Sequence, residues 1–257
     1  MNVTKIIKGL LVVSTAALFV TACQSDQQPT PATSDNLYVF NKAPLAERSY
    51  AKLPIGSVEP RGWLKKQLEL QTEGITGNLD EVWEDVGPNN GWLGGDGDSW
   101  ERGPYWLDGL LPMAYTLKDQ ELIDKANKWV EWTLQSQSED GFFGPRPDTS
   151  KMGDDQKKSI NRREEVKKDW WPRMVMLKVL QQYYEATGDE RVIDFMTDYF
   201  KYQLKHLPEQ PLDNWSHWAK TRGGENLSSV YWLYNRTGDQ FLLELGELIY
   251  KQTRDWT

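Results

Sequence analysis

The residues best suited to chemistry are concentrated in residues 91–108, which read GWLGGDGDSWERGPYWLD. Four aromatic residues, five glycines and four acidic residues share these eighteen positions. Glycine permits tight turns, carboxylates bind hydroxyl groups, and indole rings offer flat apolar faces. A ligand with both hydroxyl groups and apolar ring faces suits this mixture, so the stretch predicts a carbohydrate-binding cleft.

Three similar clusters follow along the chain, at residues 169–173 (DWWPR), 215–218 (WSHW) and 222–226 (RGGEN). Each stands where a helix is expected to begin, and helix N-termini orient carboxylates and polar ligands. We therefore expect the four clusters to meet on one face. The predicted substrate-binding residues are Trp92, Asp96, Trp100, Arg102, Trp106, Asp169, Trp170, Trp171, Arg173, His217, Trp218, Arg222 and Asn226.

Cleavage of a glycosidic bond needs two carboxyl groups, about 5 Å apart for retention and further apart for inversion. The predicted catalytic carboxylates are Glu101, Asp108 and Glu225. Purely structural roles also suit some of these positions. Asp169 and Glu225 are placed to cap helices or pair with arginines, and Trp106 also fits an apolar stripe of the core.

The elements that must position these residues are helices arranged in hairpins. Residues 111–119, 180–189 and 230–239 each end one helix with a tyrosine and a polar turn, and an aspartate then opens the next helix. Gly188 and Gly238 suit helix ends, and Asp189 and Asp239 suit N-caps.

The partner helices are expected at 120–137, 190–206 and 240–254, with a further helix at 61–71. Because the elaborate loops all fall on one side of the hairpins, the pattern predicts an all-α fold of the α/α toroid type.

The first residues have the features of a targeting segment. Two lysines precede a short apolar run in residues 1–22, and Cys23 follows small residues, as at a bacterial lipoprotein cleavage site. The sequence predicts a signal peptide over 1–22, a lipidated Cys23 with a flexible tether and lead-in over 23–52, and a folded part over 53–257. We expect an outer-membrane lipoprotein that faces the periplasm or the cell surface, with the membrane as partner through Cys23.

Charge and missing motifs exclude several classes of function. Loss of residues 1–22, with two lysines, would change the net charge from −8 to −10, which argues against nucleic acid as a partner. Cys23 is the only cysteine, so the folded part has no disulfide or cysteine nucleophile. HExxH, GxSxG and phosphate-binding glycine motifs do not occur, and the sequence predicts no metal site or cofactor within this chain.

Residues 94–119 (GGDGDSWERGPYWLDGLLPMAYTLKD) resemble the catalytic domain of the β-L-arabinofuranosidase group, glycoside hydrolase family 127 and its relatives. Gly62-Trp63-Leu64 with Gln67 and Gly74, DWWPRM at 169–174 and RGGEN at 222–226 fit the same resemblance, which covers roughly residues 53–257. It implies an (α/α)6 toroid that acts outside the cytoplasm on plant or algal glycans.

The resemblance also implies, for the best-known branch, a cysteine nucleophile held with zinc by further cysteines and a glutamate. No residue here can inherit those roles, because no cysteine follows Cys23. Zinc is thus expected only in a full-length relative. About seven helices are expected here against twelve in such a toroid, so we expect an N-terminal portion of a longer enzyme, and the chain alone need not be active.

The sequence therefore predicts a β-L-arabinofuranosidase-like glycoside hydrolase acting on plant or algal polysaccharide or oligosaccharide. One alternative is another toroid enzyme, an unsaturated uronyl hydrolase or a polysaccharide lyase, for which Arg102, Arg173 and Arg222 could bind a substrate carboxylate. The other is a surface lipoprotein that binds glycans without cleaving them.

Overall fold

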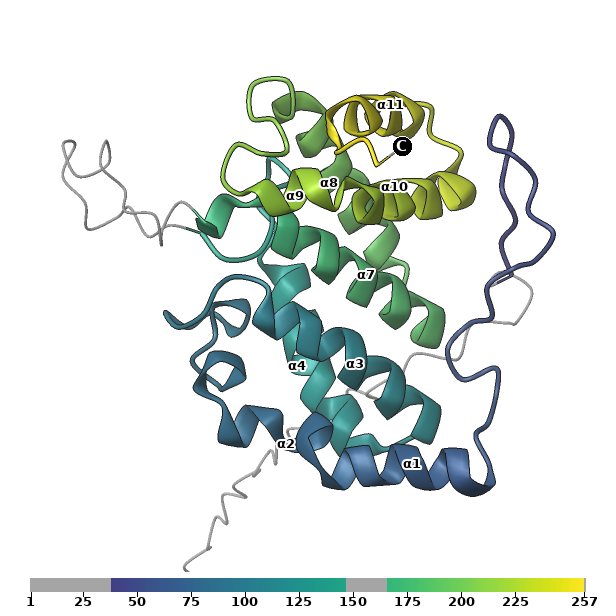
Figure 1. The fold of residues 1–257 in the computed structure, drawn as a ribbon, viewed down its shortest axis with the longest axis vertical. Helices are drawn as coiled ribbons and strands as arrows, with labels where there is room; N and C mark the ends of the chain where they lie inside the picture. Colours follow the sequence, from purple (N-terminus) through teal and green to yellow (C-terminus); the bar gives the residue numbers. More distant parts are fainter. Residues whose placement is uncertain (1–37, 147–165, 257) are drawn as a thin grey trace, which may run out of the picture.

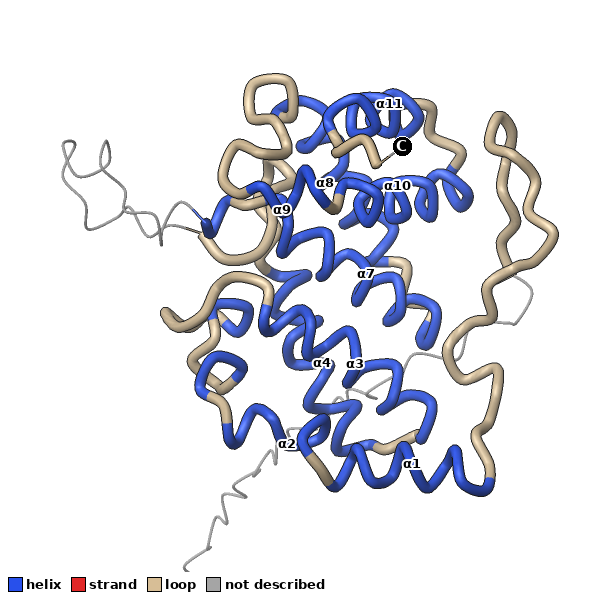
Figure 2. Tube along the Cα trace, in the orientation of Figure 1, coloured by secondary structure: helices blue, strands red, loops and turns tan. Residues whose placement is uncertain are grey.

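The computed structural model describes residues 38–146 and 166–256. Every regular element within these two ranges is helical, and Figure 2 shows no strand there. The predicted all-α fold is therefore confirmed. Among the same residues, no helix is both long enough and apolar enough to cross a membrane.

Three helix hairpins make up most of the described structure. They pair α3 (Arg102–Leu117) with α4 (Gln120–Gln135), α7 (Trp170–Thr187) with α8 (Arg191–His206), and α10 (Gly223–Thr237) with α11 (Phe241–Gln252). The first helices end at residues in the left-handed conformation, Lys118 (φ 58°), Gly188 (φ 72°) and Gly238 (φ 81°). The predicted hairpins and glycine stops are thus present.

In two of the three hairpins the second helix begins one residue later than predicted. Asp119 is the N-cap of α4, and its carboxylate accepts a hydrogen bond from the Leu122 N–H at 3.2 Å. The N-caps of α8 and α11 are Glu190 and Gln240, so the N-cap assignment of the preceding aspartates is wrong. Asp189 still accepts from the Arg191 N–H at 3.1 Å.

The hairpins lie side by side in two layers (Figure 1). In one layer α7 packs against both α3 and α10, and in the other α8 packs against α4 and α11. Because α7 has neighbours on every side, only Lys178 and Ala186 of its residues are not buried. The first turns of α3, α7 and α10 are consequently near one another, which is the arrangement the site requires.

Two short helices were not predicted. Helix α1 (Gly62–Glu73) matches the expected helix at 61–71, but α2 (Ile75–Val82) and α9 (His217–Thr221) have no counterpart in the sequence analysis. Helix α2 is kinked at Asn78 (φ −127°, ψ 18°), and α9 has five residues. Helices this short depend on tertiary contacts, so their sequences carry little periodicity. The 3-10 turns η2 (Glu84–Val86), η3 (Gly91–Leu93) and η4 (Val166–Lys168) complete the elements.

A segment without regular structure precedes α1 and runs to the far ends of α7 and α10 (Figure 1). The Lys42 N–H donates to the Asn235 side chain at 2.8 Å, and the Tyr234 hydroxyl donates to the Ala43 carbonyl. Lys52 pairs with the buried Glu185 at 2.9 Å. These contacts tie the start of the described chain to α10 and α7, at the ends of these helices opposite the aromatic loops.

Candidate functional site

Two of the predicted clusters line a common hollow of about 750 Å³. One wall is the loop over residues 84–102, and the other is the loop over residues 213–218 that leads into α9. The walls present carboxylates, indoles and an imidazole to the hollow, from Asp96, Asp98, Trp100, Arg102, Asp213, Trp215, Ser216, His217 and Trp218. This is the combination of groups that the sequence predicted for a carbohydrate site.

The first wall is folded tightly on itself by its glycines. The Asn90 side chain accepts from the Trp92 N–H at 2.7 Å, and the Gly97 N–H donates to the Asn89 carbonyl at 2.8 Å. At Gly95 a Cβ atom would overlap with that same Asn89 carbonyl oxygen, so the close backbone approach requires glycine. The result holds Asp96 and Asp98 at the surface of the hollow.

Trp92 was predicted to stack on a sugar, and the structure contradicts this. Its side chain has no exposed surface, and its indole N–H donates to the Trp100 carbonyl at 2.9 Å. The ring packs at 6.4 Å from the Trp132 ring and at 6.1 Å from the Phe143 ring. Trp92 therefore supports the first wall from beneath.

The second cluster is also buried. Trp170 is 1% exposed and donates its indole N–H to the Gln210 carbonyl at 3.0 Å. Trp171 is 2% exposed, and its indole N–H donates to the Glu101 carboxylate. Neither ring has a free face for a sugar, so the predicted stacking roles of both are wrong in this structure, and each instead fixes a neighbouring loop.

Arg173 was predicted to contact the substrate, and the structure contradicts this as well. Its guanidinium is 1% exposed and donates to four backbone carbonyls at 2.7–3.1 Å, those of Phe143, Pro145, Lys167 and Asp169. Burial lowers the pKa of Arg173 to about 10, so the group is charged at neutral pH. Arg173 joins two loops to the start of α7 and is buried away from any ligand.

Trp106 and Asn226 also lie in the interior. The Trp106 indole donates to the Thr76 carbonyl at 2.8 Å and packs at 5.7 Å from the Trp129 ring, as the core alternative had it. Asn226 is fully buried in the first turn of α10, and neither atom of its side-chain amide has a hydrogen-bond partner. Their predicted substrate contacts are therefore not available in this structure.

Asp169 is fully buried at the N-cap of α7 and cannot touch a ligand, contrary to the prediction. Its carboxylate accepts from the Trp171 N–H at 3.1 Å and from the Trp100 indole at 3.1 Å. Burial raises the pKa of Asp169, and these hydrogen bonds together with the nearby Ser216 hydroxyl oppose that effect. The capping alternative considered for Asp169 is thus correct.

The residues that do face the hollow differ in how freely they can act. Arg102 is engaged by Asp98 at 2.8 Å and by Asp85 at 3.3 Å. Asp96 is exposed and accepts from the Asn89 side chain at 2.7 Å. Burial raises the pKa of Asp98, although Arg102 opposes this. A carboxyl group of raised pKa at the edge of a hollow is suited to proton transfer.

His217 and Trp218 were expected in a loop but begin the short helix α9. Their rings lie 4.5 Å apart, both residues are exposed, and both line the hollow. Ser216 caps the helix by accepting from the Trp218 N–H at 3.3 Å. Of the predicted indoles, Trp100 and Trp218 are therefore the two with surface in the hollow.

A second group of predicted residues surrounds the phenol of Tyr105. Burial raises the pKa of Tyr105, the positive charge of Arg222 opposes this, and the carboxylates of Glu101, Glu225 and Asp108 add to it. Arg222 lies 5.3 Å from the Trp171 ring and 5.8 Å from the Trp218 ring. Arg222 therefore lies beside Trp218, which lines the hollow, and its charge acts on the same phenol as the three predicted catalytic carboxylates.

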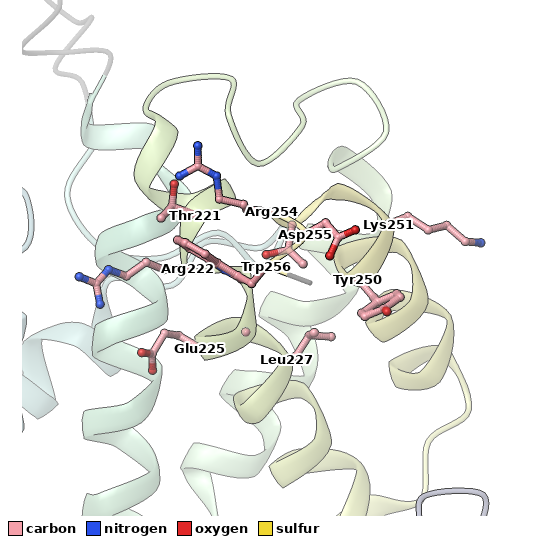
Figure 3. A pocket seen from close by; sticks show the side chains of 11 residues that line it. Thr221, Arg222, Glu225, Leu227, Tyr250, Lys251, Arg254, Asp255 and Trp256 are labelled. Atoms are coloured by element: carbon pink, nitrogen blue, oxygen red, sulfur yellow. The ribbon is translucent and has the colours of Figure 1, made fainter.

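The three carboxylates are bound to different extents. Asp108, on α3, accepts from two side chains of α7, those of Lys178 at 2.8 Å and Gln182 at 2.7 Å. Glu225 is exposed and borders a second hollow of about 1030 Å³ beside the end of α11, where Figure 3 shows it with Arg222 across from Tyr250. Glu101 accepts from the buried Trp171 indole and Asp108 has two donors, so Glu225 is the least constrained of the three.

Asp98, Tyr105 and Ser216 have a place in the site and belong to the predicted clusters, but none of them was predicted to bind substrate or to act in catalysis. Tyr105 had a usable signal, because positions 101, 105 and 108 share one face of a helix. Ser216 had the weaker signal of an N-cap residue before a helix too short to recognise.

No group of three His, Cys, Asp or Glu side chains in residues 38–146 and 166–256 could hold a metal ion. The side chains of these two ranges therefore do not fit the zinc site that the resemblance implies. Cys23, the predicted lipidation site, lies outside the described residues.

Comparison with known families identifies the chain. Searches of curated proteins and of solved structures gave no match. The family model for the β-L-arabinofuranosidase GH127 catalytic domain matches residues 39–255, which include the hollow and all three hairpins. The chain therefore belongs to the β-L-arabinofuranosidase-like glycoside hydrolases of GH127, an (α/α)6 fold family that acts on carbohydrates.

Proposed function

We propose that the hollow between residues 84–102 and 213–218 receives an L-arabinofuranosyl unit at the end of a plant or algal glycan. The observation that carries this proposal is that Trp100 and Trp218 belong to opposite walls of one hollow that also holds carboxylates. Indole faces suit the C–H surface of a sugar ring, and Asp96, Asp98 and His217 suit its hydroxyl groups.

Glu101 and Glu225 are the carboxylates that we propose act on the scissile bond, and Asp108 is the third candidate. Both are near Tyr105 and Arg222, at the N-termini of α3 and α10. A positioned carboxyl group that transfers a proton contributes roughly 10²–10⁴-fold to rate. We expect Glu101→Gln and Glu225→Gln each to lose activity by about that factor and to keep the fold.

A neutral sugar is favoured over an acidic one by the state of the arginines. Arg173 is buried with four carbonyl partners, and Arg102 is engaged by two aspartates. Arg222, the third arginine considered for a uronyl hydrolase or lyase, is exposed and lies beside the rings of Trp171 and Trp218. An acidic substrate would therefore have to displace two aspartates from Arg102 and could not reach Arg173, which disfavours that alternative.

The test is a panel of chromogenic glycosides given to the full chain. We expect hydrolysis of an aryl β-L-arabinofuranoside in preference to its α-L anomer, with no unsaturated uronic acid formed from acidic polysaccharide. Glu247→Gln, an exposed change on α11, is the matched control and should retain activity. Saturable glycan binding without release of any sugar would instead support the non-catalytic alternative.

We also propose attachment to the outer membrane through lipid on Cys23, with the folded part facing the periplasm or the cell surface. Its support is the order of lysines, apolar run and small residues before Cys23. Metabolic labelling with a fatty acid in a bacterial host should mark the wild-type chain and leave Cys23→Ala unmarked. Equal labelling of both chains would contradict the proposal.

A further inference from the structure

A chain of polar contacts connects the two aromatic walls of the hollow through a residue that no ligand can reach. The Trp100 indole donates to Asp169 at 3.1 Å. Burial raises the pKa of the Asp169 carboxyl group, and the Ser216 hydroxyl, which lies near it, opposes that effect. Ser216 in turn accepts from the Trp218 N–H at 3.3 Å. Asp169 itself is fully buried. The connection therefore runs behind the surface that faces the sugar.

The chemistry of this junction calls for a carboxylate. The groups around Asp169 are the N–H of Trp171, the indole N–H of Trp100 and the hydroxyl of Ser216, and all three can donate. A carboxylate only accepts and can satisfy all of them, whereas an amide brings two donors of its own. An asparagine at this position could keep the cap of α7 but would turn an N–H toward the Trp100 indole.

We propose that Asp169 is a positioning residue, which sets the Trp100 indole and the Ser216–Trp218 turn at the separation that the sugar ring requires. The inference rests on the proposed function for its ligand, but the geometry it concerns exists without one. Because Trp100 and Trp218 contact the sugar before and during reaction, loss of their placement should weaken binding more than turnover.

The decisive variant is Asp169→Asn, since its remaining oxygen can still cap α7. We expect KM for the aryl arabinofuranoside to rise about tenfold and kcat to stay within about threefold, as for loss of interactions made equally in the ground and transition states. Asp194→Asn, an exposed change on α8, is the matched control and should alter neither constant.

A spectroscopic measurement tests the placement directly and needs no substrate. The chain has 13 tryptophans, and in protein labelled with ¹⁵N at the indoles Trp100→Phe identifies the signal of Trp100. In the wild type this indole N–H should exchange slowly with solvent. In Asp169→Asn its signal should shift and its exchange should accelerate at least tenfold, with the Trp170 and Trp92 indoles unchanged. An unchanged Trp100 signal would overturn the proposal.

Ser216→Ala provides a second route should Asp169→Asn fail to fold. It breaks only the connection to α9, so residues 213–218 should exchange their amide protons faster by mass spectrometry while the Trp100 signal stays in place. Faster exchange at Trp100 as well, or no change at 213–218, would contradict the proposed order of contacts. If wild-type protein hydrolyses no glycoside but the indole and exchange results hold, the proposed function fails and the positioning role stands.

Discussion

Replacing Arg173 by methionine would separate the two roles considered for this residue. The structure makes Arg173 a buried connector, whereas the sequence predicted a substrate contact. Methionine removes the charge and the donors but keeps much of the side chain packed against Phe142, over whose ring the guanidinium lies at 4.1 Å. The variant thus removes the hydrogen bonds to the backbone carbonyls of residues 143, 145, 167 and 169.

The size of the effect follows from those bonds. A hydrogen bond to a charged group contributes roughly 1.5–3 kcal/mol, and a buried acceptor left unpaired costs about 1–3 kcal/mol. Because water can reach the loop carbonyls once the side chain is gone, we expect a net loss of about 4 kcal/mol in the free energy of unfolding, in line with breaking other buried charged contacts. For a chain of this size that corresponds to a Tm roughly 8–16 °C lower.

Urea denaturation followed by circular dichroism, together with sugar binding by calorimetry, gives the readout. Arg61→Met, an exposed change before α1, should stay within about 0.5 kcal/mol of wild type. Arg173→Lys keeps the charge without the planar fork and should fall between wild type and Arg173→Met. The reasoning would be refuted by an Arg173→Met protein that keeps wild-type stability, above all if it loses sugar affinity.

The remaining predictions concern single side chains around the hollow. Trp92→Ala should lower the free energy of unfolding by about 3–5 kcal/mol, because the ring is fully buried. Trp218→Ala should leave Tm nearly unchanged and weaken sugar binding about tenfold. The opposite pattern would reverse our assignment of core and ligand-facing indoles. Gly144→Ala should destabilise the protein by more than about 1 kcal/mol, because φ is 84° and the new Cβ would lie 2.7 Å from the Trp92 ring; a neutral result in thermal melts would contradict this. Burial raises the pKa of Asp169 above its ordinary 3.8, so ionisation of this carboxyl group opposes folding. The free energy of unfolding of the wild type should therefore fall, relative to that of Asp169→Asn, as pH rises through 3.8 toward the raised pKa. Parallel pH profiles of the two unfolding free energies would contradict this prediction.

Sequence periodicity was enough to predict the hairpins, because each helix buries a regular apolar stripe. Val192, Phe195, Met196 and Tyr199 recur at helical spacing, and all four are buried in α8. The short helix α9 was missed because five residues offer no period to detect. Local patterns therefore predict the helices of about three turns or more, and they miss α2, which has eight residues, as well as α9.

The same patterns could not separate ligand-facing aromatic residues from structural ones. Trp92 and Trp100 lie in one glycine-rich stretch, yet Trp92 is fully buried and Trp100 lines the hollow. The partners of Arg173 are backbone carbonyls, which leave no trace in the residue types of the loops that supply them. Burial at these positions is decided by how the hairpins pack, and that information is spread over distant parts of the chain.

The segment that binds the far ends of α7 and α10 bears on the order in which the protein can fold during synthesis. Lys42 and Asn235 are 193 residues apart in sequence, and Ala43 and Tyr234 are 191 apart. At roughly 5–20 residues per second, the ribosome needs about ten seconds or more to make the partner of a segment that emerged near the start. During that interval residues 42 and 43 lack their partners on α10, whereas Lys52 can already pair with Glu185 once α7 has been made. Docking of residues 42 and 43 is then a late, non-local event that reports completion of α10.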